Sequence, residues 1–437
     1  MDPRLLKILK MEFDMKEEDI HYINGPLDLT FLMKMYKLEG FDDLKVPPYT
    51  PAPVKEMMTD EDIFTQIRRQ DILLHHPYMS FDPVVDFVRQ ASRDPEVLAI
   101  KQTLYRVSGN SPIIAALAQA AENGKQVTVL VELKARFDEE NNIVWAKKLE
   151  KAGCHVIYGL LGLKTHSKIT LVVRKEEEGI RRYVHLGTGN YNDSTAKQYT
   201  DCGILTCAAK IGADATAVFN MLSGYSEPKS WNKLVVAPIW MRDRFLHLIE
   251  MEQKRAEEGK EARIVAKMNS LCDKDVIAAL YAASAAGVKI DLIVRGICCL
   301  KVGIPGISEN ITVRSIVGNF LEHSRIFYFY SDGKEQLFMG SADWMPRNLD
   351  KRVEIVFPVE DPKLKEEVKH ILQIQLADNV KAHILQPDGT YEKIDKRGKQ
   401  LVNSQEYFCE EAHRKAETKT NPGHDRIFIP AEAPEEV

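Results

Sequence analysis

Apolar residues recur along most of the chain with two alternating spacings. In segments such as SPIIAALAQAAENG (111–124) they lie three and four residues apart, whereas in the following run VTVLVEL (127–133) they are closely spaced and rich in branched side chains. The first spacing is typical of an amphipathic helix and the second of a buried strand. Glycines at positions 124 and 153 follow helical segments, as expected at helix C-termini. The pattern therefore predicts an α/β fold built on mostly buried sheets.

The same succession of helix, glycine and strand occurs twice. The segment IAALAQAAENGKQVTVLV (114–131) aligns without a gap with IAALYAASAAGVKIDLIV (277–294). Further along, THSKITLVV (165–173) has a counterpart in EHSRIFYFY (322–330). Each of these strands leads to a turn of small residues, GTGNYND at 187–193 and GSADWMPRN at 340–348. Because the elements recur in the same order, we predict two tandem αβ domains related by an internal repeat.

The repeat sets the expected domain organisation. Residues 1–53 contain helical pieces and end in the proline-rich VPPYTPAP, so we expect a short remnant at the end of a helical head domain. The first αβ domain should span 54–233 and the second 234–418. Residues 419–437 are rich in proline and glutamate and are expected to form a disordered tail. A length of 437 residues suits two or three domains.

Composition narrows the class of protein. The chain is 44% hydrophobic and 28% charged, and it has no apolar run long enough for a membrane span. Its N-terminus lacks the apolar core of a signal peptide, and its seven cysteines show no metal-type spacing. We therefore expect a cytoplasmic protein. A net charge of -5 argues against general nucleic-acid binding, so a polyanion would need a local basic cluster.

A histidine and a cation lie two residues apart at the start of each repeated strand. Because strand side chains alternate, His166 and Lys168 should face one side, as should His323 and Arg325. A lone histidine in such a place is usually just the solvated start of a strand. Here the pair is duplicated, and two histidines flanked by cations suit a substrate rich in oxyanions. A neutral histidine is a good phosphoryl acceptor, so the pattern favours phosphoryl transfer.

Other polar residues follow predicted strands, where ligands of α/β sheets gather. Asp201 could orient a histidine or bind Mg²⁺ through water, although a solvated turn residue fits equally well. Tyr199 should face the same side and could border a nucleotide base. Four arginines are candidates for binding phosphates: Arg106, Arg136, Arg295 and Arg352.

Together, several motifs resemble the polyphosphate kinases of bacteria over residues 45–418: KQTLYR, VTVLVELKARFDEENN, GLKTHSKI, HLGTGNYN, YTDCGILT and GSADWMPRNLDKRVEI. The resemblance implies a phospholipase D-like fold of two similar domains. It also implies reversible transfer of the ATP γ-phosphate to inorganic polyphosphate, with Mg²⁺ as cofactor and a homo-oligomer in the longer family members.

The resemblance also implies roles for individual residues. His166 matches the phosphohistidine, and His323 matches a second active-site histidine. Tyr199, Arg295 and His323 match positions that contact ATP. Arg106 and Arg136 match positions near Mg²⁺, where they would grip the phosphates that the metal bridges. Asp201 and Arg352 match further active-site positions, and Lys168 and Arg325 would hold the transferred oxygens.

Two other functions stay open. The phospholipase D signature, H-x-K-x4-D, has an aspartate where this chain has Val173 and Tyr330. That difference favours the kinase over a phospholipase D-like phosphodiesterase acting through the same histidine. A module that binds polyphosphate or nucleotide without turnover is the second alternative.

Overall fold

The computed structural model describes residues 2–25, 27–28, 30–105, 111–132, 139–160 and 162–417, excluding the side chains of 139–141. The chain divides into two compact units, Met1–Thr50 and Pro51–Val437. The tail predicted at 419–437 lies outside the described residues, and the domain boundaries predicted at 53, 233 and 418 stay predictions. Within the described part of the chain, no helix is long and apolar enough to cross a membrane.

The N-terminal unit contains the helical pieces that the sequence predicted. Helix α1 spans Pro3–Glu12 and α2 spans Phe31–Tyr36, with 3-10 turns at Glu17–Asp19 and Asp42–Leu44. The side chain of Asp2 caps α1 by accepting the N–H of Arg4 at 2.8 Å. Neither helix contains a buried residue.

In the larger unit, the first sheet has the strand order β1-β8-β7-β6-β2-β3-β4. Its strands are β1 Ile72–His76, β2 Val97–Leu104, β3 Gln126–Val131, β4 His155–Ile157, β6 Ile169–Glu176, β7 Gly179–Gly187 and β8 Tyr199–Thr206. Its helices are α3 Ile63–Arg69, α4 Asp82–Arg93, α5 Pro112–Glu122, α6 Glu139–Lys151 and α7 Ala209–Leu222. Neighbouring side chains on one strand reach opposite cores: Leu171 packs with α7, whereas Val172 packs with α3, α4 and α5. The sheet is therefore buried on both faces.

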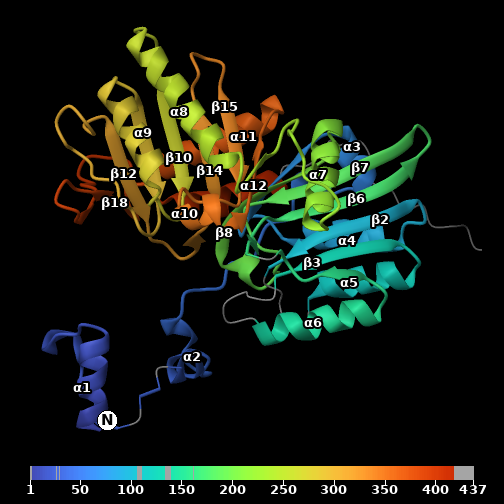
Figure 1. Ribbon diagram of the computed structural model, residues 1–437, viewed down its shortest axis with the longest axis horizontal. Coiled ribbons are helices and arrows are strands. Elements are labelled where there is room, and N and C mark those ends of the chain that lie inside the picture. Colours follow the sequence, from blue (N-terminus) through green and yellow to red (C-terminus); the bar gives the residue numbers. More distant parts are fainter. Residues whose placement is uncertain are drawn as a thin grey trace, which may run out of the picture. The chain divides into compact units, whose positions relative to one another are not determined.

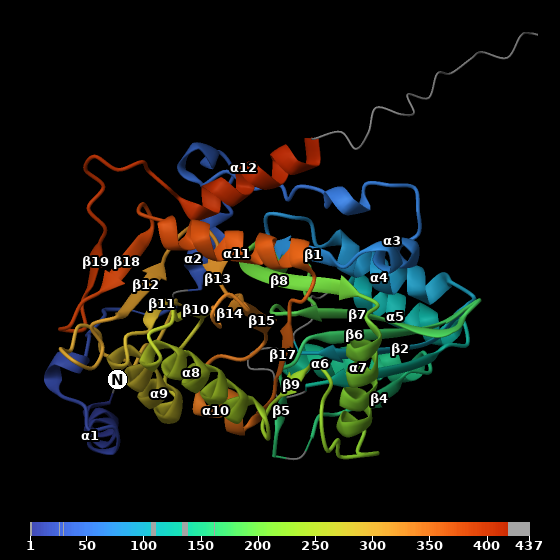
Figure 2. The same cartoon turned by 90° about the horizontal axis from the view of Figure 1, so that it is seen from above.

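The second sheet has the order β19-β18-β12-β11-β10-β14-β15-β17-β9. Its strands are β9 Val235–Val236, β10 Arg263–Met268, β11 Lys289–Val294, β12 Ile311–Ile316, β14 Arg325–Phe329, β15 Gln336–Gly340, β17 Ile355–Pro358, β18 Ala382–Leu385 and β19 Tyr391–Lys393. Its helices are α8 Met241–Glu257, α9 Lys274–Ala285, α10 Pro346–Asp350, α11 Pro362–Ala377 and α12 Ser404–Glu417. Figure 1 shows α8 and α9 along one face of this sheet. Figure 2 shows α11 and α12 together on the other side, and both contribute to the core shared by the two sheets.

Strand pairing confirms the internal repeat. In the first sheet, β2 pairs in parallel with β3 and antiparallel with β6; in the second, β10 pairs in parallel with β11 and antiparallel with β14. The predicted α/β fold of two similar domains is therefore confirmed.

The larger unit has a first half built on the first sheet and a second half built on the second sheet. Two very short strand pairs join these halves. Strand β5 (Lys164–Thr165) of the first half pairs with β16 (Arg352–Val353) of the second, and β13 (Leu321–Glu322) of the second pairs with β8 of the first. The sequence placed both histidines inside strands, but β6 begins at Ile169 and β14 at Arg325. Each histidine instead lies where the chain passes from the junction between halves into its own sheet.

Candidate active site

His166 is fixed by contacts with the opposite half of the molecule. The N–H groups of His166 and Ser167 both donate to the carbonyl oxygen of Val353, at 2.9 and 3.0 Å. The next residue, Glu354, places its carboxylate oxygens 2.9 and 3.0 Å from Nδ1 of His166. The ring of Tyr105 meets the imidazole edge-on, with 5.0 Å between centroids. The imidazole is therefore held on two sides while its Nε2 takes no part in these contacts.

Glu354 is completely buried and is itself held by neutral donors. Its carboxylate accepts a hydrogen bond from the Ser341 hydroxyl and one of 2.6 Å from Nδ2 of Asn348. Because an ionised carboxylate only accepts, the proton of neutral His166 resides on Nδ1 when Glu354 is ionised. The lone pair is then on Nε2, which is the nucleophilic nitrogen.

His323 is held in the same way by the first half. Its Nδ1 lies 2.9 Å from both carboxylate oxygens of Asp201, and its N–H donates to Oγ1 of Thr200 at 3.2 Å. The Thr188 hydroxyl donates to Asp201 at 2.6 Å, and the Tyr199 ring meets the imidazole at 5.2 Å. Each histidine thus receives its carboxylate from the other repeat.

Sequence reasoning missed Glu354, although a signal existed. Thr188 and Ser341 are separated by the same number of residues as Asp201 and Glu354, and each hydroxyl donates to the carboxylate of its own repeat. Extending the repeat through the turns would have aligned the two carboxylates. Glu354 would then have become a candidate partner of a histidine.

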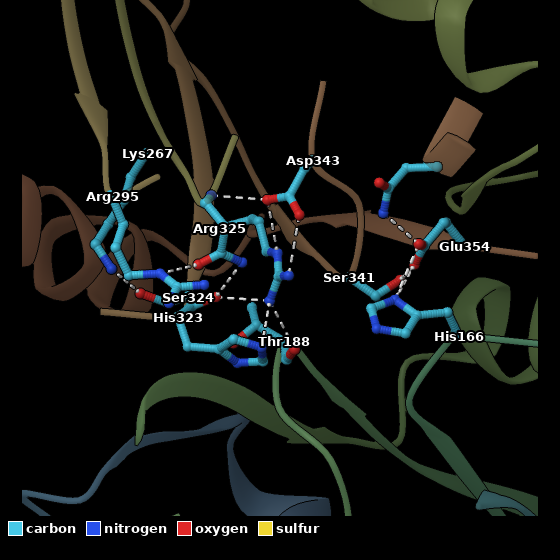
Figure 3. A network of polar contacts seen from close by, with 12 residues as sticks. His166, Thr188, Lys267, Arg295, His323, Ser324, Arg325, Ser341, Asp343 and Glu354 are labelled. Carbon is cyan, nitrogen blue, oxygen red and sulfur yellow. Dashed lines mark hydrogen bonds and ion pairs between the residues drawn. The ribbon is translucent and has the colours of Figure 1, made fainter. Parts of the chain in front are cut away.

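Arg325 lies between the two histidines (Figure 3). It is 3% exposed, and its Nε and Nη2 donate to Asp343 at 3.1 and 3.2 Å. Its Nη1 donates to the carbonyl of His323 at 2.6 Å and lies 3.3 Å from Nε2 of the same ring. Much of the hydrogen-bonding capacity of the Arg325 guanidinium is therefore used by acceptors of the protein itself. Its Nη1 is the group nearest the His323 ring.

Lys168 is buried on the His166 side. Its ammonium donates to the carbonyl oxygen of His166 and lies 5.6 Å from the centre of the Tyr105 ring. Burial lowers the pKa of Lys168 to about 7; Glu354 opposes this shift, whereas Arg325 and Arg352 add to it. Lys168 can therefore lose its charge near neutral pH.

The electrostatics keep the imidazole of His166 neutral. Burial lowers the pKa of His166 well below its ordinary value, and the nearby cations, Lys168 first, add to the effect. Burial also lowers the pKa of His323, partly offset by Asp201. For Asp201, burial acts to raise the pKa, but His323 and the Thr188 hydroxyl outweigh it and lower the pKa to about 2. Burial raises the pKa of Glu354 to about 7.

The remaining predicted site residues divide between the two histidines. Nε of Arg295 donates to Oδ1 of Asn269 at 3.0 Å, and Nδ2 of Asn269 lies 3.5 Å from the carbonyl of His323. Arg352 lies on the other side, with Nη1 3.9 Å from Glu354. Arg106 and Arg136 lie outside the described residues. In the described ranges, no three histidine, cysteine, aspartate or glutamate residues form a group suited to a metal ion.

Comparison with known proteins places this site in a family. Residues 62–228 match the model of the polyphosphate kinase C-terminal domain 1, and residues 234–405 match that of C-terminal domain 2. The polyphosphate kinase of Halalkalibacterium halodurans is 56% identical over 417 residues, covering 95% of this chain and 59% of that protein. The polyphosphate kinase of Bacillus anthracis is 55% identical over 407 residues, covering 93% of this chain and 58% of that protein.

A solved structure agrees. The polyphosphate kinase of Porphyromonas gingivalis superposes with a TM-score of 0.85 at 37% identity, covering 96% of this chain and 64% of that one. The chain thus spans less than two thirds of the length of these three relatives. Family models cover both repeats, and the relatives match nearly the whole chain. The resemblance seen in the sequence is therefore confirmed: the chain belongs to the polyphosphate kinase family.

Proposed function

We propose that this chain carries the catalytic centre of a polyphosphate kinase, which transfers the ATP γ-phosphate reversibly to the end of a polyphosphate chain. The observation that supports it best is the His166–Glu354 contact. It gives a neutral imidazole with its proton on Nδ1 and its lone pair on Nε2, which is the form a phosphoryl acceptor needs.

In the first step, Nε2 of His166 attacks the γ-phosphorus of ATP. An N–P bond forms, the bond from phosphorus to the bridging oxygen breaks, and its electrons leave with ADP. The ring becomes a cation while Nδ1–H stays bonded to Glu354, which stabilises that charge. Phosphoryl transfer depends mainly on positioning and charge, which Lys168 and Arg325 would supply around the transferred oxygens. Tyr199 and Arg295, near His323, are the proposed contacts of the nucleotide.

In the second step, a terminal oxygen of polyphosphate attacks the phosphorus and the N–P bond breaks, restoring neutral His166. His323 would serve as an acid or as an electrostatic partner, with Asp201 fixing its ring. Arg352 is the proposed phosphate contact beside His166, and Arg106 and Arg136, which lie outside the described residues, remain proposed phosphate contacts. The reverse reaction uses the same groups in the opposite order.

Mg²⁺, which the resemblance implies, fits this site as a companion of the ATP phosphates. Three carboxylates of the site, Asp201, Asp343 and Glu354, are each engaged by a histidine or an arginine. Mg²⁺ commonly binds through substrate phosphates and water rather than a cage of protein ligands. When bound, it would neutralise charge on the β- and γ-phosphates, while the protein contributes positioning.

The test is turnover. With ATP and Mg²⁺ the chain should form polyphosphate, with ADP and polyphosphate it should form ATP, and His166→Ala should abolish both. Hydrolysis of bis(p-nitrophenyl) phosphate without either kinase reaction would favour the phosphodiesterase. Binding of polyphosphate without turnover would favour a binding module. The homo-oligomer and the cytoplasmic location stay predictions.

A further inference from the structure

Glu322, the residue before His323, lies at the centre of a buried polar network. It is 3% exposed and is not among the groups that contact either imidazole. Its carboxylate accepts from four side chains: Nζ of Lys267 at 2.8 Å, Oγ1 of Thr200 at 3.0 Å, Nε2 of Gln375 at 3.0 Å and Nε2 of Gln405 at 2.7 Å. A buried carboxylate with this many donors is fully satisfied and has one defined orientation.

Gln405, in the first turn of α12, forms hydrogen bonds with the segment that leads to His323. Besides Glu322, its Nε2 donates to the carbonyl of Phe320 at 2.9 Å, and its Oε1 accepts the N–H of Phe320 at 2.9 Å. The amide thus uses both hydrogens and its oxygen on residues 320–322. The fit is close, because a Cβ at Gly318 would overlap Oε1 of Gln405.

The hydrogen bonds of Gln405 hold the backbone next to His323. Leu321 donates its N–H to the carbonyl of Gln198 at 2.8 Å, which sets β13 against β8. On the other side of the histidine, Nζ of Lys267 donates to the Ser324 hydroxyl at 2.5 Å (Figure 3). Since Asp201 lies on β8, the position of β13 along β8 determines whether the His323 ring meets that carboxylate.

The first half is built differently. The counterpart of Glu322 is Thr165, whose N–H donates to Oε2 of Glu132 at 2.9 Å. His166 and Thr165 are thus held by Val353, Glu354 and Glu132, whereas the segment before His323 is also tied to the C-terminal helix α12. The same helix packs on the first half, since the Phe408 ring lies 5.0 Å from His75 and 5.2 Å from Tyr78.

We propose that Gln405 is a positioning residue for His323: through Glu322 and Phe320, helix α12 holds the imidazole against Asp201. The catalytic consequence rests on the proposed function, whereas the structural consequence does not. Movement of α12 would loosen His323 while leaving His166 and Glu354 in place. Phosphoryl transfer that needs both histidines would then slow.

The test replaces the amide by a side chain of similar length. Gln405→Met removes both donated bonds and the accepted one, and Gly318→Ala displaces the same amide from the other side. Gln253→Met is the matched control, because that half-buried glutamine on α8 donates to Glu257 of the same helix, at 2.8 Å. In protein labelled with ¹⁵N-histidine, the Nδ1–H signal of His323, assigned by its loss in His323→Gln, reports the bond to Asp201.

We expect this signal to shift or vanish in Gln405→Met and Gly318→Ala. In Gln253→Met it should persist, and the Tm of that control should change little. The kcat for polyphosphate synthesis should fall by about 10-fold to 100-fold in the first two, because small displacements of catalytic groups are costly. An unchanged signal in whichever of the two variants folds would overturn the proposal. If the wild-type chain shows no turnover, the proposed function fails, and the NMR signal still decides the positioning role.

Discussion

The Glu354 carboxylate should determine which nitrogen of His166 can react, and Glu354→Gln tests this without a change of size. Both oxygens of Glu354 lie within 3.0 Å of Nδ1. Whichever way a glutamine amide is placed, its NH₂ group occupies one of these two positions. It can then donate to Nδ1, which moves the ring proton to Nε2 and blocks attack. The amide also lacks the negative charge that stabilises the cationic phosphohistidine.

The expected loss is large because the tautomer and the charge are both affected. Replacing the carboxylate partner of a catalytic histidine by an amide costs about 10⁴-fold in the serine proteases. Since Asn348 and Ser341 still orient the side chain here, we expect a loss of about 10³-fold to 10⁴-fold in the rate of phosphorylation. That corresponds to about 4 to 5 kcal/mol of barrier.

The assay is rapid-quench labelling of the protein with γ-labelled ATP and Mg²⁺. Glu252→Gln is the matched control, because Glu252 is also completely buried and accepts the Ser331 N–H at 2.7 Å but is no part of the candidate site. It should lower the Tm and leave labelling per folded molecule unchanged. A folded Glu354→Gln variant that labels at the wild-type rate would show that Glu354 does not determine the reactive nitrogen of His166.

Three further predictions follow from the charges of the site. The labelling rate should rise with pH as Glu354 ionises and fall as Lys168 loses its proton, because burial brings the pKa of each group to about 7. A pH series should therefore give a maximum near pH 7. A flat profile would show that Glu354 and Lys168 do not control the labelling rate. The pKa of Asp201 is lowered to about 2 from 3.8, which contributes about 2 kcal/mol to the free energy of unfolding. This contribution is complete above pH 4 and is lost as the pH falls toward 2. In urea unfolding, the difference in stability between wild type and Asp201→Asn should therefore narrow from pH 5 to pH 3, and a constant difference would contradict the lowered pKa. Arg325→Met leaves the Asp343 carboxylate buried without its cation and should lower the free energy of unfolding by about 3 to 5 kcal/mol, whereas a loss below 1 kcal/mol would show that the pair is not structural.

The sequence predicted the repeated helices and strands and singled out the two histidines, because these depend on local pattern. Helix and strand spacing repeats over segments long enough to be recognised, as in 114–131 and 277–294. His166 and His323 were found because each comes shortly before the apolar run of a repeated segment and lies two residues from a cation. Tyr199 and Asp201 were expected to face the same side, and both lie on β8 with their side chains next to His323.

Contacts between the halves could not be predicted in the same way. Strands β5 and β13 are two residues long, too short to show a period, and they decide which carboxylate meets which histidine. The burial of Lys168 and the ion pair between Arg325 and Asp343 depend on packing between elements far apart in the chain. The role of α12 in holding the segment before His323 is likewise a property of the assembled fold.

If His166 carries the transferred phosphoryl group, that group can be located on the protein itself. The wild-type chain and His166→Ala are incubated with γ-labelled ATP and Mg²⁺, digested at alkaline pH, and analysed by mass spectrometry and by the acid and base stability of the label. We expect an acid-labile, base-stable label on the peptide that contains His166, and none on the variant. A label on another residue, or a label that persists in His166→Ala, would contradict this role of His166.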